Sequence, residues 1–142
     1  MIHVSVAGAT GRMGALTKGL IDADSNLKLH SALDSSSAAT EMLGADVVVD
    51  FTNHAVSQEL VEFAIANDLK IVVGTSGWSE QKLASLEKLL LKHPSAGVVV
   101  VPNFSIGSML AQQFAAQAAQ YFDSIEILEA HHENKIDSPS GT

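Results

Sequence analysis

The residues best suited to chemistry lie in the stretch 131–142, which reads HHENKIDSPSGT. His131 comes at the end of a predicted strand at 124–130, so we expect its imidazole to be held in a defined position. A histidine titrates near neutral pH and can deliver a proton, and the ammonium group of Lys135 comes four residues later. The final Ser-Gly-Thr offers hydroxyl and backbone N–H groups to a carboxylate. The stretch therefore predicts a site that holds an anion and delivers a proton.

Two other interpretations of the same stretch stay open. The pair His131–His132 could belong to a metal site, but no further cluster of ligands stands out in the sequence, so we expect no metal. The stretch could also be an ordinary polar loop.

A second candidate site is the glycine-spaced turn from Gly8 to Gly14, GATGRMG. It comes directly after a predicted strand at 2–7 and before a predicted helix at 15–23. Glycines at such a turn let a pyrophosphate approach the backbone, and the helix N-terminus supplies N–H groups and a positive dipole end. This context favours nucleotide binding over the alternative, in which the glycines only form a turn and pack against the helix.

Asp34 supports the nucleotide interpretation. It ends a predicted strand at 27–33 and follows Gly14 by 20 residues, where an acid can accept hydrogen bonds from the ribose hydroxyls. A carboxylate there repels a 2′-phosphate, and no Arg or Lys follows it closely. Arg12 lies in the glycine turn and could offset the repulsion. We therefore predict NADH as the preferred cofactor, with NADPH as the alternative and a solvated loop acid as the other interpretation of Asp34.

Three further polar or glycine-rich corners follow predicted strands. They are Asp50-Phe51-Thr52, Gly74-Thr75-Ser76-Gly77 and Asn103-Phe104-Ser105. In an open α/β sheet, ligands bind beyond the carboxyl ends of the strands. Together with the glycine turn, the corners predict a groove for an extended cofactor.

The elements that must position these residues alternate along the chain. Further strands are predicted at 46–51, 70–73, 98–101 and 124–130, and further helices after Asn53, after Ser79 and at 106–121. Several of the strands are continuous apolar runs, as in a parallel sheet covered on both faces. The predicted fold class is α/β, a Rossmann-like parallel sheet with helices on both faces, followed by the start of an incomplete α+β domain.

Composition narrows the functional classes. The chain has 142 residues, of which 46% are hydrophobic, and a net charge of −8, which argues against nucleic acid or an anionic membrane as a partner. It has no cysteine, a basic leader is lacking after Met1, and no apolar run approaches the roughly 20 residues that span a bilayer. We expect a cytoplasmic protein with a small-molecule substrate.

In order along the chain, these motifs resemble the 4-hydroxy-tetrahydrodipicolinate (dihydrodipicolinate) reductase family of lysine biosynthesis. The resemblance rests on GATGRMG at 8–14, Asp-Phe-Thr at 50–52, VGTSG at 73–77, NFSIG at 103–107 and the block from Glu129 to Thr142. The NFSIG and HHxxKxDxPSGT blocks together are highly specific, whereas the glycine turn is not. The resemblance implies hydride transfer from NADH or NADPH to a cyclic dicarboxylate derived from 4-hydroxy-tetrahydrodipicolinate, in the diaminopimelate route to lysine.

The resemblance also implies roles for individual residues. His131 is similar to the family's proton donor, and Lys135 to its partner at the ring nitrogen. Substrate contacts would come from His132, Lys135, Ser140, Gly141 and Thr142. Cofactor contacts would come from Gly8, Gly11, Arg12, Met13 and Asp34 at the pyrophosphate and ribose end, and from Phe51, Gly74, Thr75, Asn103 and Phe104 toward the nicotinamide.

Members of that family are longer than this chain and form homotetramers. The resemblance implies a dinucleotide-binding domain at 1–104 and a partial substrate-binding and catalytic domain at 105–142. We therefore expect this chain to be an N-terminal portion that binds dinucleotide and turns substrate over poorly, and not to form the tetramer on its own. The alternative is an NAD(P)-binding module without catalysis of its own.

Overall fold

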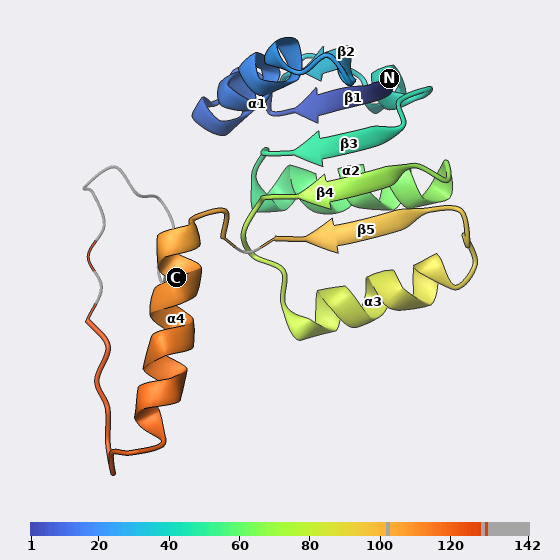
Figure 1. Cartoon of the computed structure of the whole chain (residues 1–142). Helices are drawn as coiled ribbons and strands as arrows, with labels where there is room; N and C mark the ends of the chain where they lie inside the picture. Colours follow the sequence, from blue (N-terminus) through green and yellow to red (C-terminus); the bar gives the residue numbers. More distant parts are fainter. Residues whose placement is uncertain (102, 129, 131–142) are drawn as a thin grey trace. The chain divides into compact units, whose positions relative to one another are not determined.

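The computed structural model describes residues 1–101, 103–128 and 130, and divides the chain into two compact units after Val101. The first unit holds one parallel sheet with the strand order β2-β1-β3-β4-β5 (Figure 1). The strands are β1 (Ile2–Ala7), β2 (Leu27–Leu33), β3 (Val47–Asp50), β4 (Lys70–Val73) and β5 (Gly97–Val100). Because all five run in the same direction, the residues that follow them lie along one edge of the sheet.

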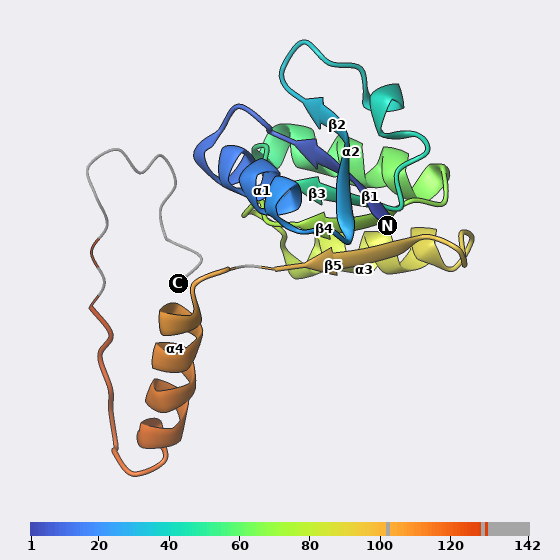
Figure 2. The same ribbon diagram turned by 45° about the horizontal axis from the view of Figure 1, so that its top comes forward.

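Helices cover both faces of this sheet, as the sequence predicts (Figures 1 and 2). Helix α1 (Arg12–Ala23) packs through Ile21 against Val4 and Val6 of β1. On the opposite face, α2 (His54–Ala66) and α3 (Glu80–Leu90) enclose the larger core, which includes Met42, Val48, Val61, Ile65, Ile71, Val73 and Leu86. Side chains alternate between the two faces along β3, so Val48 and Asp50 both face α2 and α3.

Local sequence explains where two of the helices begin. The side-chain oxygen of Asn53 accepts hydrogen bonds from the backbone N–H groups of Ala55 (3.0 Å) and Val56 (3.2 Å) at the start of α2. Ser79 accepts one from the N–H of Lys82, at 3.4 Å, at the start of α3. Both caps satisfy donors that have no partner inside the helix, which confirms the predicted helix starts.

The structure differs from the sequence prediction at three places. Helix α1 begins at Arg12, inside the glycine turn, rather than at residue 15. A short 3-10 helix, Ala39–Met42, was not predicted and places Met42 in the core with none of its side chain exposed. The predicted strand at 124–130 is wrong, because residues 124–128 and 130 form no strand. A strand requires a neighbour to pair with, and none of the described strands pairs with this segment.

In the second unit the described element is helix α4 (Ile106–Ala119), capped by the hydroxyl of Ser105, which accepts from the N–H of Ser108 at 3.3 Å. None of its residues is buried, although Met109 and Phe114 are large and apolar. The predicted helix at 106–121 is thus confirmed to within two residues.

Candidate functional site

The glycine turn joins β1 to α1 at the carboxyl edge of the sheet. Gly8 adopts a φ of 76°, which L side chains rarely tolerate, and a Cβ atom on it would lie 2.4 Å from the carbonyl oxygen of Phe51. A Cβ atom on the buried Gly14 would lie 2.2 Å from the carbonyl oxygen of Gly8. Both positions therefore require glycine on steric grounds, and the turn leaves no room for side chains where its backbone folds back.

The N-terminus of α1 opens from this turn without a side-chain cap. Gly11 occupies the cap position, and no side-chain cap bond is formed there among the described residues. Arg12 is exposed and Met13 is half-buried on the first turn. Uncapped N–H groups and the positive end of a helix dipole form a favourable environment for a phosphate oxygen. These groups would be available to a phosphate oxygen, and phosphate binding at this turn stays a prediction.

The loop between β3 and α2, Phe51–Asn53, lies beside the glycine turn. The backbone N–H of Phe51 donates to the carbonyl of Ala7 at 3.0 Å, directly before Gly8. The strands β1 and β3 are neighbours although β2 comes between them in the chain. The contact between Gly8 and Phe51 therefore lies at the point where the strand order reverses, which is where α/β sheets bind their ligands.

The loop that follows β4 contacts the β3–α2 segment from its other side. The N–H of Gly74 donates to the carbonyl of Asp50 at 2.8 Å, and a Cβ atom on Gly77 would lie 3.0 Å from that of His54. Thr75 is only 6% exposed, and its buried Oγ1 has no hydrogen-bond partner among the described residues. An unpaired buried hydroxyl is unfavourable, so this atom is suited to receive a polar group of a ligand.

Asp34 directly follows β2 and is exposed. Its Oδ1 accepts hydrogen bonds from the hydroxyl (2.7 Å) and the backbone N–H (2.8 Å) of Ser36. These two bonds, the hydroxyl first, hold the pKa of Asp34 below its ordinary value. Neither bond uses Oδ2. The two bonds thus orient the carboxylate, as an acceptor for ribose hydroxyls would need to be.

The remaining predicted residues fall in the second unit or outside the described residues. Asn103 donates from Nδ2 to the hydroxyl of Ser108 (2.8 Å) and accepts at Oδ1 from the N–H of Ser105 (2.8 Å). These bonds fix the start of α4, and Phe104 beside them is 48% exposed. The predicted catalytic and substrate-binding residues His131, His132, Lys135, Ser140, Gly141 and Thr142 lie outside the described residues.

The buried hydrogen bonds of one residue in this region were not predicted, although the sequence placed it in the corner Asp50-Phe51-Thr52. Asp50 is fully buried at the end of β3, and its Oδ1 accepts from the N–H (2.9 Å) and the hydroxyl (2.6 Å) of Thr52. Its Oδ2 accepts a short hydrogen bond from the hydroxyl of Ser57, which is also fully buried. The sequence signal for these bonds was an acid at the end of a valine run, followed by a hydroxyl residue in the first turn of the next helix.

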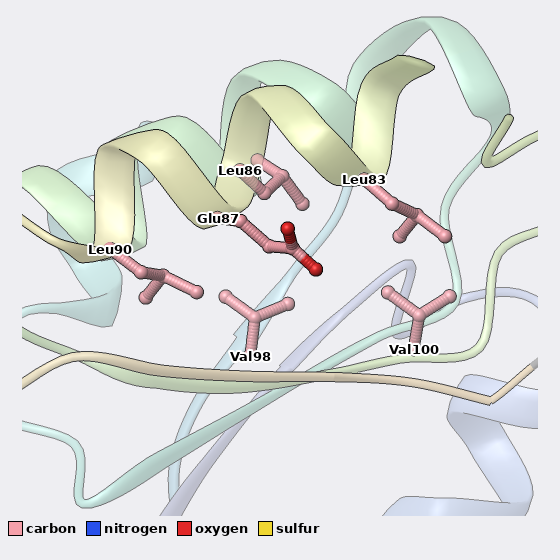
Figure 3. A pocket seen from close by; sticks show the side chains of 6 residues that line it. All are labelled: Leu83, Leu86, Glu87, Leu90, Val98 and Val100. Carbon is pink, nitrogen blue, oxygen red and sulfur yellow. The ribbon is translucent and has the colours of Figure 1, made fainter. Parts of the chain in front are cut away.

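A pocket lies elsewhere in the first unit, between α3 and β5 (Figure 3). Leu83, Leu86 and Leu90 of α3 face Val98 and Val100 of β5, and Glu87 is the single charged residue among the lining residues. None of the predicted site residues lines this pocket. Its walls are otherwise aliphatic and offer no cation or N-terminal helix end for a phosphate, so we assign the candidate site to the carboxyl edge of the sheet.

Two other searches concern only the part of the chain that the structure describes. Within it, no group of three or more His, Asp or Glu side chains is arranged to hold a metal ion. No helix among those residues is long and apolar enough to cross a membrane.

Family comparisons match nearly the whole chain. The family described as "Dihydrodipicolinate reductase, N-terminus" matches residues 2–104, and "Dihydrodipicolinate reductase, C-terminus" matches residues 107–142. A 4-hydroxy-tetrahydrodipicolinate reductase of Clavibacter sepedonicus is 50% identical over 139 residues, which is 98% of this chain and 50% of that protein. One from Cutibacterium acnes is 43% identical and covers 100% of this chain and 58% of its own length. The chain thus spans about half the length of these curated relatives.

Solved structures give the same result for the fold. A dipicolinate-bound dihydrodipicolinate reductase from Paenisporosarcina sp. TG-14 matches with a TM-score of 0.77 and 29% identity, over 99% of this chain and 62% of that chain. A myo-inositol 2-dehydrogenase from Lactobacillus plantarum, with a TM-score of 0.60 and 14% identity over 83% of this chain and 42% of its own, shows the fold alone. Because the family matches cover residues 2–104 and 107–142, this chain belongs to the dihydrodipicolinate reductase family.

Proposed function

We propose that this chain is the dinucleotide-binding portion of an NAD(P)H-dependent 4-hydroxy-tetrahydrodipicolinate reductase. The observation that carries the proposal is the contact between the glycine turn and the Phe51 loop, beside the uncapped N-terminus of α1. A pyrophosphate would bind over Gly8, Gly11, Arg12 and Met13. This placement uses the N–H groups and the dipole of α1, which favour negative charge.

The other end of the cofactor would extend along the sheet edge. Asp34 would accept hydrogen bonds from the adenosine ribose, because Ser36 orients its carboxylate. Its negative charge favours NADH over NADPH. Phe51, Gly74 and Thr75 would line the path toward the nicotinamide, and the buried, unpaired hydroxyl of Thr75 supports this placement. Asn103 and Phe104 are proposed for the same end from their motif.

When bound, a reduced nicotinamide supplies the hydride. In the proposed reaction, which forms tetrahydrodipicolinate in the diaminopimelate route to lysine, the residues of this chain bind and protonate the substrate. His131 would donate the proton and Lys135 would stabilise negative charge at the ring nitrogen. Substrate carboxylates would be held by His132, Lys135, Ser140, Gly141 and Thr142. These roles rest on the family motif.

The family assignment extends the proposal to the organisation of the whole protein. We propose a dinucleotide-binding domain at 1–104, followed by a substrate-binding and catalytic domain that begins at 105. A cytoplasmic homotetramer is proposed for the full-length protein. The proposal assigns no role to nucleic acid, a membrane or a metal ion.

The experiment that tests the proposal is a fluorescence titration of the 142-residue chain with NADH and NADPH, alongside a turnover assay. We expect saturable binding of both, with the lower Kd for NADH. Failure of the chain to bind either nucleotide would refute the proposed role of the glycine turn.

The same experiment distinguishes the proposed reductase from the alternative, a binding module without catalysis of its own. This alternative has support because most of the proposed cofactor contacts lie within residues 1–101, whereas the catalytic motif lies at 131–142. Binding with no turnover by this chain, but turnover by a protein that continues beyond Thr142, would assign catalysis to the longer protein. No turnover by either would favour the binding module.

A further inference from the structure

At the carboxyl edge, the β3–α2 loop lies between the glycine turn that follows β1 and the loop that follows β4. On one side its Phe51 carbonyl occupies the space where a Gly8 side chain would be. On the other side, the residues that flank the loop contact the segment after β4: a Cβ atom on Gly77 would lie 3.0 Å from that of His54, and the Asp50 carbonyl accepts from the N–H of Gly74. A displacement of this loop would therefore move the wall of the glycine turn and the anchor of the β4 loop together.

A single buried carboxylate holds this loop in place. Asp50 accepts two hydrogen bonds from Thr52 within the loop and one from Ser57 in the first turn of α2. Charge-assisted hydrogen bonds of this kind are stronger than neutral ones, and an acidic group is also favoured near a helix N-terminus. The side chain thus ties the end of β3, the loop and the start of α2 into one rigid unit.

Neither Asp50 nor Ser57 can touch a ligand, because both side chains are fully buried. Within the part of the chain that the structure describes, the two side chains form hydrogen bonds with each other and with Thr52. An effect of either residue on nucleotide binding must therefore be transmitted through the loop.

We propose that Asp50 is a positioning residue, assisted by Ser57, which fixes the β3–α2 loop as the common wall of the glycine turn and the Gly74–Gly77 loop. This inference rests on the proposed dinucleotide function of that edge. It adds a group that does not contact the cofactor but sets the shape of the surface that does.

A matched pair of serine variants of the 142-residue chain tests the proposal. Ser57→Ala removes the hydroxyl that bonds Asp50, whereas Ser5→Ala removes an equally buried hydroxyl in β1, which bonds Ser31 at 2.7 Å away from the three loops. Both variants should lower the urea midpoint. We expect Ser57→Ala to raise the Kd for NADH about tenfold, which corresponds to about 1.4 kcal/mol. Ser5→Ala should leave the Kd within about twofold of wild type.

Asp50→Asn provides a second comparison. Asparagine keeps the shape and the oxygen that accepts from Thr52, but its NH₂ group cannot accept from the Ser57 hydroxyl, so both the charge and that hydrogen bond are lost. We expect its Kd for NADH to rise above that of wild type. A Kd for Ser57→Ala within twofold of wild type, or an equal loss of affinity in Ser5→Ala, would overturn the positioning role.

Amide hydrogen exchange, measured without nucleotide, tests the positioning role of Asp50 independently of the proposed cofactor function. We expect Ser57→Ala, but not Ser5→Ala, to speed exchange at the backbone amides of Phe51, Thr52 and Gly74. If wild type binds no nucleotide, the cofactor proposal fails, while this exchange pattern still supports the control of the loop by Asp50. Unchanged exchange at all three amides would overturn that control.

Discussion

Replacement of Gly14 by alanine tests the reasoning about the glycine turn most directly. The added methyl carbon would lie 2.2 Å from the carbonyl oxygen of Gly8 and 2.8 Å from the Cα of Ala9. Favourable contacts between such atoms begin near 3.5 Å, so the start of α1 or the turn must move by about 1 Å. Overpacking of this kind destabilises a fold by about 1–3 kcal/mol.

Gly19→Ala is the matched control, because Gly19 lies in the same helix and a methyl group there would meet no atom within 4 Å. Both substitutions gain about 1 kcal/mol of helix propensity. That gain cancels in the comparison, so the two variants should differ by the steric term alone, about 1–3 kcal/mol. For a unit of this size, each kcal/mol corresponds to a Tm difference of about 4–8 °C.

Thermal unfolding followed by the fluorescence of Trp78, the single tryptophan of the chain, reports on the first unit. We expect Gly19→Ala to melt above wild type and Gly14→Ala to melt at least about 4 °C below Gly19→Ala. Gly14→Ala should also weaken NADH binding, because its methyl group displaces the carbonyl of Gly8. Equal Tm values for the two variants would refute the steric argument.

Three further predictions concern single side chains. Thr75→Val should stabilise the nucleotide-free chain by about 1 kcal/mol, because it removes a buried hydroxyl that has no partner among the described residues. The same substitution should weaken NADH binding severalfold. Urea unfolding measures the gain in stability, and an NADH titration measures the loss of affinity. Asn53→Ala should destabilise the fold by about 1 kcal/mol and by more than Ser79→Ala, because Asn53 accepts two capping bonds and Ser79 accepts one longer bond; a larger loss for Ser79→Ala in urea unfolding would contradict this. Ser36→Ala should return the pKa of Asp34 toward its ordinary value, as measured by NMR titration. Because the folded pKa of Asp34 is lowered, its contribution to stability is present above about pH 4 and is lost as the pH falls through the folded pKa, and Ser36→Ala should reduce that loss.

Much of the first unit could be predicted because its signals are local. The β2 strand shows a two-residue alternation, and Asn53 and Ser79 mark helix starts that need only neighbouring residues to form. The glycine turn was recognised by its spacing. The start of α1 within that turn was not predicted, because a helix start depends on backbone angles as well as on apolar periodicity.

The features that could not be predicted depend on distant partners or on very short elements. Residues 124–128 have the composition of a strand, but composition cannot supply the pairing partner. The Ala39–Met42 helix is too short to show a period. The bond between Asp50 and Ser57 joins a strand to a helix, and the direction of both side chains follows only from the packed fold.

The strand order also has a consequence for how the first unit folds. Strands β1 and β2 form one contiguous half with α1, and strands β3 to β5 form another with α2 and α3. The halves join along the β1–β3 pairing, which aligns Val4 with Val47 and Ala7 with Asp50. Pairing across so many residues closes a long loop and slows folding. We expect this pairing to form late, so nucleotide binding, which needs Gly8 against Phe51, would report on completion of the last folding step.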